Sequence, residues 1–162
     1  MIIKHPGPLR GFDYVGRHYD SLTWCCDYRK PHFTQADRVE LVKQQFLRAC
    51  SESDFEIDAY CFMPDHVHQL VRGVLLESNA RRYITLAKQY SGYYFSRAYG
   101  EKLWQRYGHD RWLPDEQAVR AVVGYIIKNP VQAKLVERIE DYPHIGSGTR
   151  SLEELIEWAI VR

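Results

Sequence analysis

Residues 55–72 of the chain read FEIDAYCFMPDHVHQLVR, and this stretch decides the fold. Apolar side chains recur at every second position over residues 55–63, which is the pattern of a strand. The prediction assigns these residues to one shared face: Phe55, Ile57, Ala59, Cys61 and Met63. Pro64 and Asp65 then signal a turn, and residues 66–72 read as a second strand. Two strands with so short a link pair as an antiparallel hairpin.

The segments that flank the hairpin predict a mixed fold. Aromatic and β-prone residues indicate a further strand over residues 18–27 and a short one over residues 111–113. Apolar residues at helical spacing, each run preceded by a capping residue, predict helices over residues 35–51, 80–98, 116–128 and 151–160. We expect the third helix to end near Asn129, because the residue before a proline disfavours the helical conformation.

The order strand–helix–strand–strand–helix–strand–helix resembles the ferredoxin-like split βαβ arrangement. The expected fold class is therefore α+β, with an antiparallel sheet and helices packed on one face. Such a sheet leaves its other face free for a ligand. We expect one domain over residues 1–162, with an irregular N-terminal arm at about residues 1–17 and a short C-terminal helix at about residues 151–160.

Charge is unevenly distributed along the chain. The formal net charge of +1 does not by itself indicate a nucleic-acid-binding protein. Between residues 79 and 111, however, basic residues outnumber the acids, which are Glu101 and Asp110. The basic residues of this segment are Arg81, Arg82, Lys88, Arg97, Lys102, Arg106 and Arg111. The segment is either a basic band for phosphates or a solvated helix face.

The cysteines and the apolar runs indicate a compartment. The chain has 4 cysteines and none of them forms a CxxC pair, which argues against a zinc framework or a disulfide scaffold. The first residues lack the apolar run of a signal peptide, and no apolar run is long enough to span a membrane. We therefore expect a cytoplasmic protein without a membrane partner.

His66 and His68 are separated by one residue in the second strand of the hairpin, so their imidazoles point to the same side of the sheet. The pair is either a hydrogen-bonded surface pair or part of a metal site. Two nitrogen ligands leave a divalent cation open to substrate oxygens, which suits catalysis. A third ligand would come from another element, as a carboxamide or a carboxylate. Such a set accepts Mg²⁺ or Mn²⁺ when phosphates are present, and could accept Zn²⁺.

Tyr125 lies at the edge of the apolar stripe of the third predicted helix, and Asn129 follows one turn later. One interpretation is a boundary tyrosine that packs its ring and exposes its hydroxyl. The other is chemical, because a tyrosine hydroxyl can attack a phosphodiester while a metal polarises the phosphate.

The chain resembles the REP-associated tyrosine transposases, relatives of the insertion-sequence transposases in the single-tyrosine HUH nuclease group. The resemblance rests on YCFMPDHVHQLV (residues 60–71), LWQR (103–106), YIIKNPVQAKLV (125–136) and DYP (141–143) followed by IGSG. It implies that His66 and His68 bind a divalent metal, that Tyr125 is the nucleophile and that Asn129 is the third ligand. The implied substrate is single-stranded DNA that carries a REP-type hairpin, cut through a 5′-phosphotyrosine intermediate with release of a 3′ hydroxyl.

Basic residues near these motifs are the candidates for DNA binding: Arg10, Arg17, Arg81, Arg82, Lys88, Arg106, Arg111 and Lys128. The segment GHDRWLP departs from the family pattern at Gly108, His109 and Pro114. His109 is an extra imidazole that either approaches the active site or, as we expect, lies at the surface or in contact with DNA. Asp65 is either part of the turn alone or a partner of His66.

Two other functions remain open: a nucleic-acid-binding module without chemistry, and a metal-dependent hydrolase that uses water. Monomer and homodimer are both compatible with the resemblance.

Overall fold

The computed structural model describes residues 14–161. Its strands are β1 (Tyr19–Cys25), β2 (Phe55–Met63), β3 (His66–Gly73), β4 (His109–Leu113) and β5 (Ile145–Gly146). Its α-helices are α1 (Ala36–Ser53), α2 (Ala80–Tyr99), α3 (Glu116–Gln132) and α4 (Leu152–Ile156), the last continued by a π-helical turn at Glu157–Val161. The predicted DNA contact at Arg10 lies outside the described residues.

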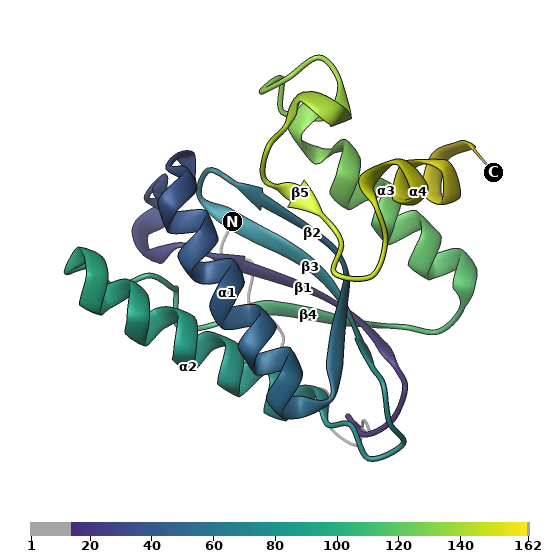
Figure 1. The fold of residues 1–162 in the computed structure, drawn as a ribbon, viewed down its shortest axis with the longest axis horizontal. Coiled ribbons are helices and arrows are strands. Elements are labelled where there is room, and N and C mark those ends of the chain that lie inside the picture. The colour runs from purple at the N-terminus through teal and green to yellow at the C-terminus, as the bar shows by residue number, and fades with distance from the viewer. Residues whose placement is uncertain (1–13, 162) are drawn as a thin grey trace, which may run out of the picture.

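The strands form one sheet in the order β4-β1-β3-β2-β5, and each neighbouring pair is antiparallel. Because β3 lies between β1 and β2, those two strands run in the same direction without touching, which defines the split βαβ arrangement. The predicted α+β, ferredoxin-like fold is confirmed (Figure 1). The short edge strand β5 was not predicted.

One face of the sheet is covered by α1 and α2, which lie side by side (Figure 1). Trp24 of β1 packs at its centre, with its ring edge-on to Phe46 of α1 and to Trp104. Trp24 and Phe46 are almost completely buried. Aromatic side chains bury a large area per residue, so a few of them suffice to pack α1 and α2 against the sheet.

The prediction placed helices on one face of the sheet. In the structure, the second face carries helices as well, namely α3 and α4. Val123, Ile126 and Ile127 of α3 pack against Cys61 of β2 and Leu70 of β3 in a separate core cluster. The apolar stripe of α3 therefore finds its surface on the side that was expected to stay free. Within residues 14–161, the part toward β1 and β4 is left open beneath the edge of α3.

A β-bulge in β2 creates the apolar surface that α3 covers. Ile57 pairs with Val71 and Ala59 pairs with Leu70, so β2 has one extra residue, Asp58, between two pairs that are adjacent in β3. Phe55 and Ile57 thus face α1 and α2, whereas the later alternate residues Ala59, Cys61 and Met63 face α3. The prediction that all five share one face is wrong, because a bulge reverses the alternation.

The predicted caps of α2, α3 and α4 agree with the structure, whereas α1 begins after Gln35, which makes no side-chain capping hydrogen bond. Asn79 accepts from the backbone amides of Arg81 and Arg82, and Asp115 accepts from that of Ala118. Ser151 and Glu154 form a capping box at α4. The predicted end of α3 is wrong, because the helix continues through Pro130 to Gln132. Pro130 is buried, so tertiary packing outweighs the local preference at this position.

Among residues 14–161, no helix has both the length and the apolar character that crossing a membrane would require.

Asp20 of β1 provides a test of burial in the sheet. This residue is only 3% exposed, and burial, followed by the nearby Asp110 carboxylate, raises the pKa of Asp20 to about 7 from the value of 3.8 for a free side chain. A group that binds protons more tightly in the folded state destabilises that state as pH rises between these two values. Asp20→Asn should therefore stabilise the protein more near pH 8 than near pH 5, by on the order of 2–3 kcal/mol.

Urea unfolding of both proteins at the two pH values measures this difference, and other titrating groups cancel in the comparison. An equal gain at both pH values would mean that Asp20 is ionised in the folded protein.

Candidate active site

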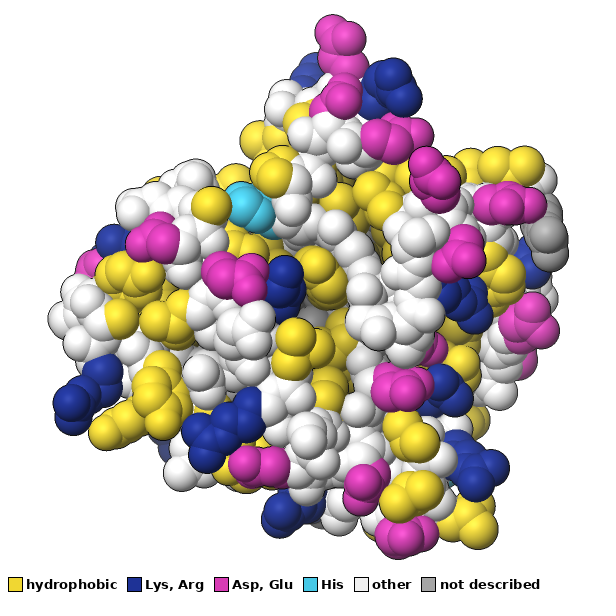
Figure 2. Space-filling model, in the orientation of Figure 1, with side chains coloured by type: hydrophobic (Ala, Val, Ile, Leu, Met, Phe, Trp, Pro, Cys, Tyr) yellow, Lys and Arg dark blue, Asp and Glu magenta, His cyan; other side chains and the backbone are white. Residues whose placement is uncertain are grey.

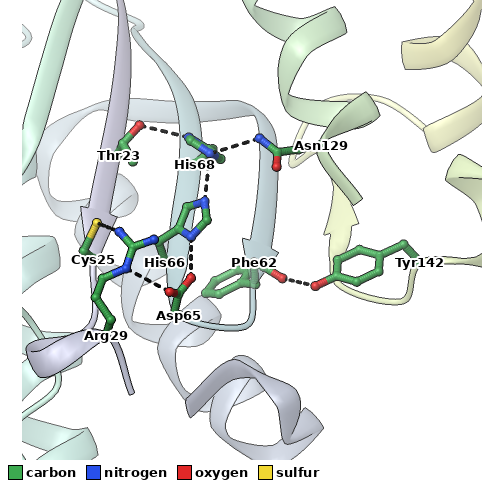
Figure 3. A network of polar contacts seen from close by, with 9 residues as sticks. All are labelled: Thr23, Cys25, Arg29, Phe62, Asp65, His66, His68, Asn129 and Tyr142. Carbon is green, nitrogen blue, oxygen red and sulfur yellow. Dashed lines mark hydrogen bonds and ion pairs between the residues drawn. The ribbon is translucent and has the colours of Figure 1, made fainter. Parts of the chain in front are cut away.

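His66 and His68 lie at the start of β3 on the face that carries α3, and their imidazoles converge. The two Nε2 atoms are 3.1 Å apart, and the ring planes are almost perpendicular at 89° (Figure 3). Cross-strand pairing sets this position, because His68 lies opposite Thr23 of β1 and opposite Cys61 of β2. His68 is 7% exposed, so its ring is held within the sheet surface.

Each imidazole has a partner on its other nitrogen. His66 Nδ1 lies 2.7 Å from Asp65 Oδ1, and His68 Nδ1 lies 2.9 Å from Thr23 Oγ1. With a proton on each Nδ1, donated to these oxygens, both Nε2 lone pairs would be available to a cation. Without a cation, the Nε2–Nε2 contact is a hydrogen bond that needs a proton on one of the two atoms. Burial, followed by the charges of His66 and Arg29, lowers the pKa of His68 to about 4. His68 is therefore neutral near pH 7, as a metal ligand must be.

The helix α3 supplies Tyr125 and Asn129 to the same place. Asn129 Nδ2 lies 3.2 Å from His68 Nε2, and the ring centroids of Tyr125 and His68 are 5.4 Å apart. Rotation of the Asn129 amide would turn its oxygen toward the histidines instead of its nitrogen. Tyr125 is 55% exposed, so a macromolecular substrate can reach its hydroxyl. Four residues that sequence reasoning selected from two separate motifs therefore lie together.

A cavity of about 460 Å³ lies between α3 and the open part of the sheet. Its lining residues are Ser21, Thr23, His68, His109, Arg111, Ala118, Ala121, Val122 and Tyr125. Across the floor, His68, Thr23 and His109 occupy one row of three neighbouring strands. The cavity therefore offers imidazole, hydroxyl and guanidinium groups beside the tyrosine.

The sequence left open whether His109 approaches this site, and the predicted strand began only at residue 111. In the structure β4 begins at His109, so His109 and Arg111 alternate onto the same face. The alternation of HDRWL was the signal that could have identified both residues.

A divalent cation fits the histidine pair. Two nitrogen ligands that each lie about 2.1 Å from a cation, with about 90° between the bonds, are about 3 Å apart. The observed Nε2–Nε2 distance is 3.1 Å. Within residues 14–161, no group of three or more His, Cys, Asp and Glu side chains is arranged to hold a metal. A cation here would thus depend on the two histidines, the Asn129 amide and substrate oxygens.

The predicted DNA-binding residues divide between the two sides of the sheet. Arg111 lines the cavity, and Lys128 is exposed on α3 between Tyr125 and Asn129. Arg106 is exposed just before β4, with its guanidinium 5.2 Å from the centre of the Tyr107 ring. Arg17 lines a second cavity, of about 460 Å³, at the other end of α3.

The three predicted DNA-binding residues of α2 lie on the opposite side of the sheet from the histidine pair. Arg81 stacks over Tyr14 at 4.5 Å, and Arg82 donates to the Glu52 carbonyl at 3.4 Å. Lys88 is partly buried, with its ammonium 5.4 Å from the Trp24 ring. On the face shown in Figure 2, Lys and Arg are interspersed with Asp and Glu. This face does not present a continuous basic surface.

Comparison with known proteins gives a consistent result. Residues 15–126 match the family model described as "Transposase IS200 like". The chain is 27% identical over 133 residues to a Haemophilus influenzae protein assigned as a REP-associated tyrosine transposase, with 73% of this chain and 72% of that protein aligned.

Two solved structures are also similar to the chain. One, described as a REP-associated tyrosine transposase bound to a REP hairpin, has a TM-score of 0.70 and 18% identity over 86% of this chain and 82% of its own. The other is a Deinococcus radiodurans protein assigned as a transposase, with a TM-score of 0.53 and 20% identity over 76% of this chain and 97% of its own. At these identities the structures support the fold alone.

The low pKa of His68 can be measured directly. We expect its ring signals in an NMR titration of the metal-free protein to change only below about pH 5, whereas an unperturbed histidine titrates near 6.5. Burial is the main cause, so the same residue in urea-unfolded protein should return to the ordinary value. A midpoint above about pH 6 in the folded protein would contradict the buried, neutral imidazole.

Proposed function

Because the chain belongs to the IS200-like transposase family, we propose that it is a metal-dependent endonuclease and strand transferase that cuts single-stranded DNA beside a hairpin through Tyr125. The observation that carries this proposal is the convergence of an exposed tyrosine with the two histidines and the asparagine at one cavity. The names of the similar proteins support a REP-type hairpin as the substrate class.

In the proposed reaction, the Tyr125 hydroxyl oxygen attacks the phosphorus of a phosphodiester, and the bond from phosphorus to the 3′ oxygen breaks. Tyr125 becomes linked to the 5′ phosphate, its proton is lost, and the 3′ oxygen leaves as a hydroxyl. One phosphoester replaces another, so a second 3′ hydroxyl can reverse the step and join a new strand. The exposure of Tyr125 lets both strands reach the same atom.

The other polar residues of the site would orient the phosphate for this attack. His66, His68 and the Asn129 amide would hold Mg²⁺ or Mn²⁺, which when bound would polarise the phosphate and stabilise the charge that develops on it. Arg111, on the floor of the cavity, would pair with a phosphate oxygen next to the cleavage site. His109, in the row of His68 and Thr23, can donate a hydrogen bond to the same backbone.

The covalent step can be tested with a labelled DNA hairpin that carries a single-stranded flank, taken from the DNA around the gene. With Mg²⁺ or Mn²⁺ we expect an adduct that resists denaturant, identified by mass spectrometry as DNA joined to Tyr125. Tyr125→Phe, which removes only the nucleophilic oxygen, should reduce adduct formation at least about 1,000-fold.

His66→Ala combined with His68→Ala should also abolish the adduct while leaving DNA binding in place. Cleavage that survives in Tyr125→Phe would instead indicate a hydrolase that uses water. Binding without cleavage under every metal would indicate a module that has no chemistry.

The salt dependence of DNA binding tests the role of Arg111. We expect Arg111→Gln to weaken binding and to lower the slope of log K against log salt by about 1, as the loss of one phosphate contact does. Arg82→Gln removes the same charge from α2, on the other side of the sheet, and should leave the slope unchanged. An equal change in both variants would mean that the DNA also reaches α2.

A further inference from the structure

We propose that Asp65 and Arg29 act as a positioning pair that fixes the ring of His66 toward the cation site. The proposal rests on the proposed function only in that the cation is the species toward which His66 is aimed. A chain of contacts runs from Arg29 Nε to Asp65 Oδ2 at 2.8 Å and from Asp65 Oδ1 to His66 Nδ1 at 2.7 Å (Figure 3). It ends at His66 Nε2, 3.1 Å from His68 Nε2.

Both oxygens of Asp65 are engaged in this chain, which sets the role of the carboxylate. Oδ1 accepts from His66 and Oδ2 accepts from Arg29. A carboxylate held on both sides cannot turn to become a ligand without breaking one contact. Asp65 therefore orients His66 and raises the basicity of its other nitrogen, as a carboxylate does behind many metal-binding histidines.

The backbone around Asp65 is held to the segment that follows β1. The Cys26 amide donates to the Asp65 carbonyl at 2.9 Å, and the Phe33 amide donates to the Pro64 carbonyl at 3.0 Å. Cys26 and Phe33 are almost completely buried, so these two hydrogen bonds anchor the turn to the core. The turn between β2 and β3 thus presents Asp65 at a fixed place beside His66.

Arg29 reaches Asp65 from an unfavourable backbone conformation. Tyr28 and Arg29 have φ values of 52° and 54°, in the left-handed region that costs free energy for residues other than glycine. Tyr28 is 87% exposed, so burial of its side chain does not offset that cost. Arg29 makes contacts that can, since its Nη1 also lies 2.8 Å from Cys25 Sγ. The contacts of the Arg29 guanidinium with Asp65 and Cys25 therefore offset the free energy that the left-handed turn costs.

Metal binding separates this role from simple electrostatics. Asp65 carries a negative charge near the cation site and Arg29 carries a positive one. If only charge mattered, Arg29→Gln would remove repulsion and strengthen the binding of a cation. If the pair positions His66, the same variant weakens binding, because Asp65 is no longer held against the imidazole.

The experiment measures the dissociation constant of Mn²⁺ for the DNA-free protein by electron paramagnetic resonance. We expect a rise of about 10-fold to 100-fold in Asp65→Ala and a rise in the same direction in Arg29→Gln. Asp27→Asn is the matched control, since it removes a nearby carboxylate that pairs with Lys102 instead of a histidine. It should change the constant less than about 3-fold. Tighter binding in Arg29→Gln, or equal losses in Asp27→Asn and Asp65→Ala, would overturn the proposal.

A second measurement does not depend on the metal. Nitrogen-15 NMR of the metal-free protein should show His66 with its proton on Nδ1 at pH values where the ring is neutral, and a mixture of tautomers in Asp65→Ala. Asp65→Asn keeps an acceptor oxygen and should restore much of the wild-type tautomer. If Asp65 only stabilised the turn, the oxygen would not matter and Asp65→Asn would not restore it. An unchanged tautomer in Asp65→Ala would exclude positioning. Two results together would separate the proposals: no Mn²⁺ binding by the wild-type protein, and a mixture of His66 tautomers in Asp65→Ala. The metal proposal would then fail and the positioning proposal would stand.

Discussion

The alternation of side chains along β3 is the constraint on which the rest of the structure depends. This strand pairs with β1 on one side and with β2 on the other, so its residues are fixed in two registers at once. Val67 and Val71 point toward α1 and α2, whereas His68 and Leu70 point toward α3. A shift of one residue would turn the histidines into the aromatic core and move the valines to the face that carries α3. The register that stabilises the core therefore also fixes the site.

The helix α3 both packs on the sheet and carries two residues of the candidate site. Its apolar side packs on the surface that follows the bulge in β2, and its edge carries Tyr125 and Asn129 over the histidine row. The same packing leaves a cavity toward β1 and β4, where no other described element covers the sheet among residues 14–161. Because one rigid helix supplies both groups, their position relative to the histidines follows from core packing and not from a mobile loop.

The polar groups of the site are supported from several elements. Thr23 on β1, Asp65 in the turn after β2 and Asn129 on α3 each contact one of the two imidazoles. The similar fold of proteins that share only 18% and 20% identity indicates how little of the sequence the scaffold requires. A fold alone does not define an activity. The proposed activity depends on the set of side chains that the scaffold brings to one point.

Local periodicity in the sequence determined the strands β2 and β3, the helix starts at Asn79, Asp115 and Ser151, the shared face of the histidines, and the one-turn spacing of Tyr125 and Asn129. Each of these depends on residues that are close together along the chain. Only the tertiary structure decided the bulge after Ile57, the face that α3 covers, the entry of His109 into the cavity and the contact of Arg29 with Asp65. That contact joins residues 36 positions apart. Such features arise when distant segments compete for the same surface, and short-range patterns do not encode that competition.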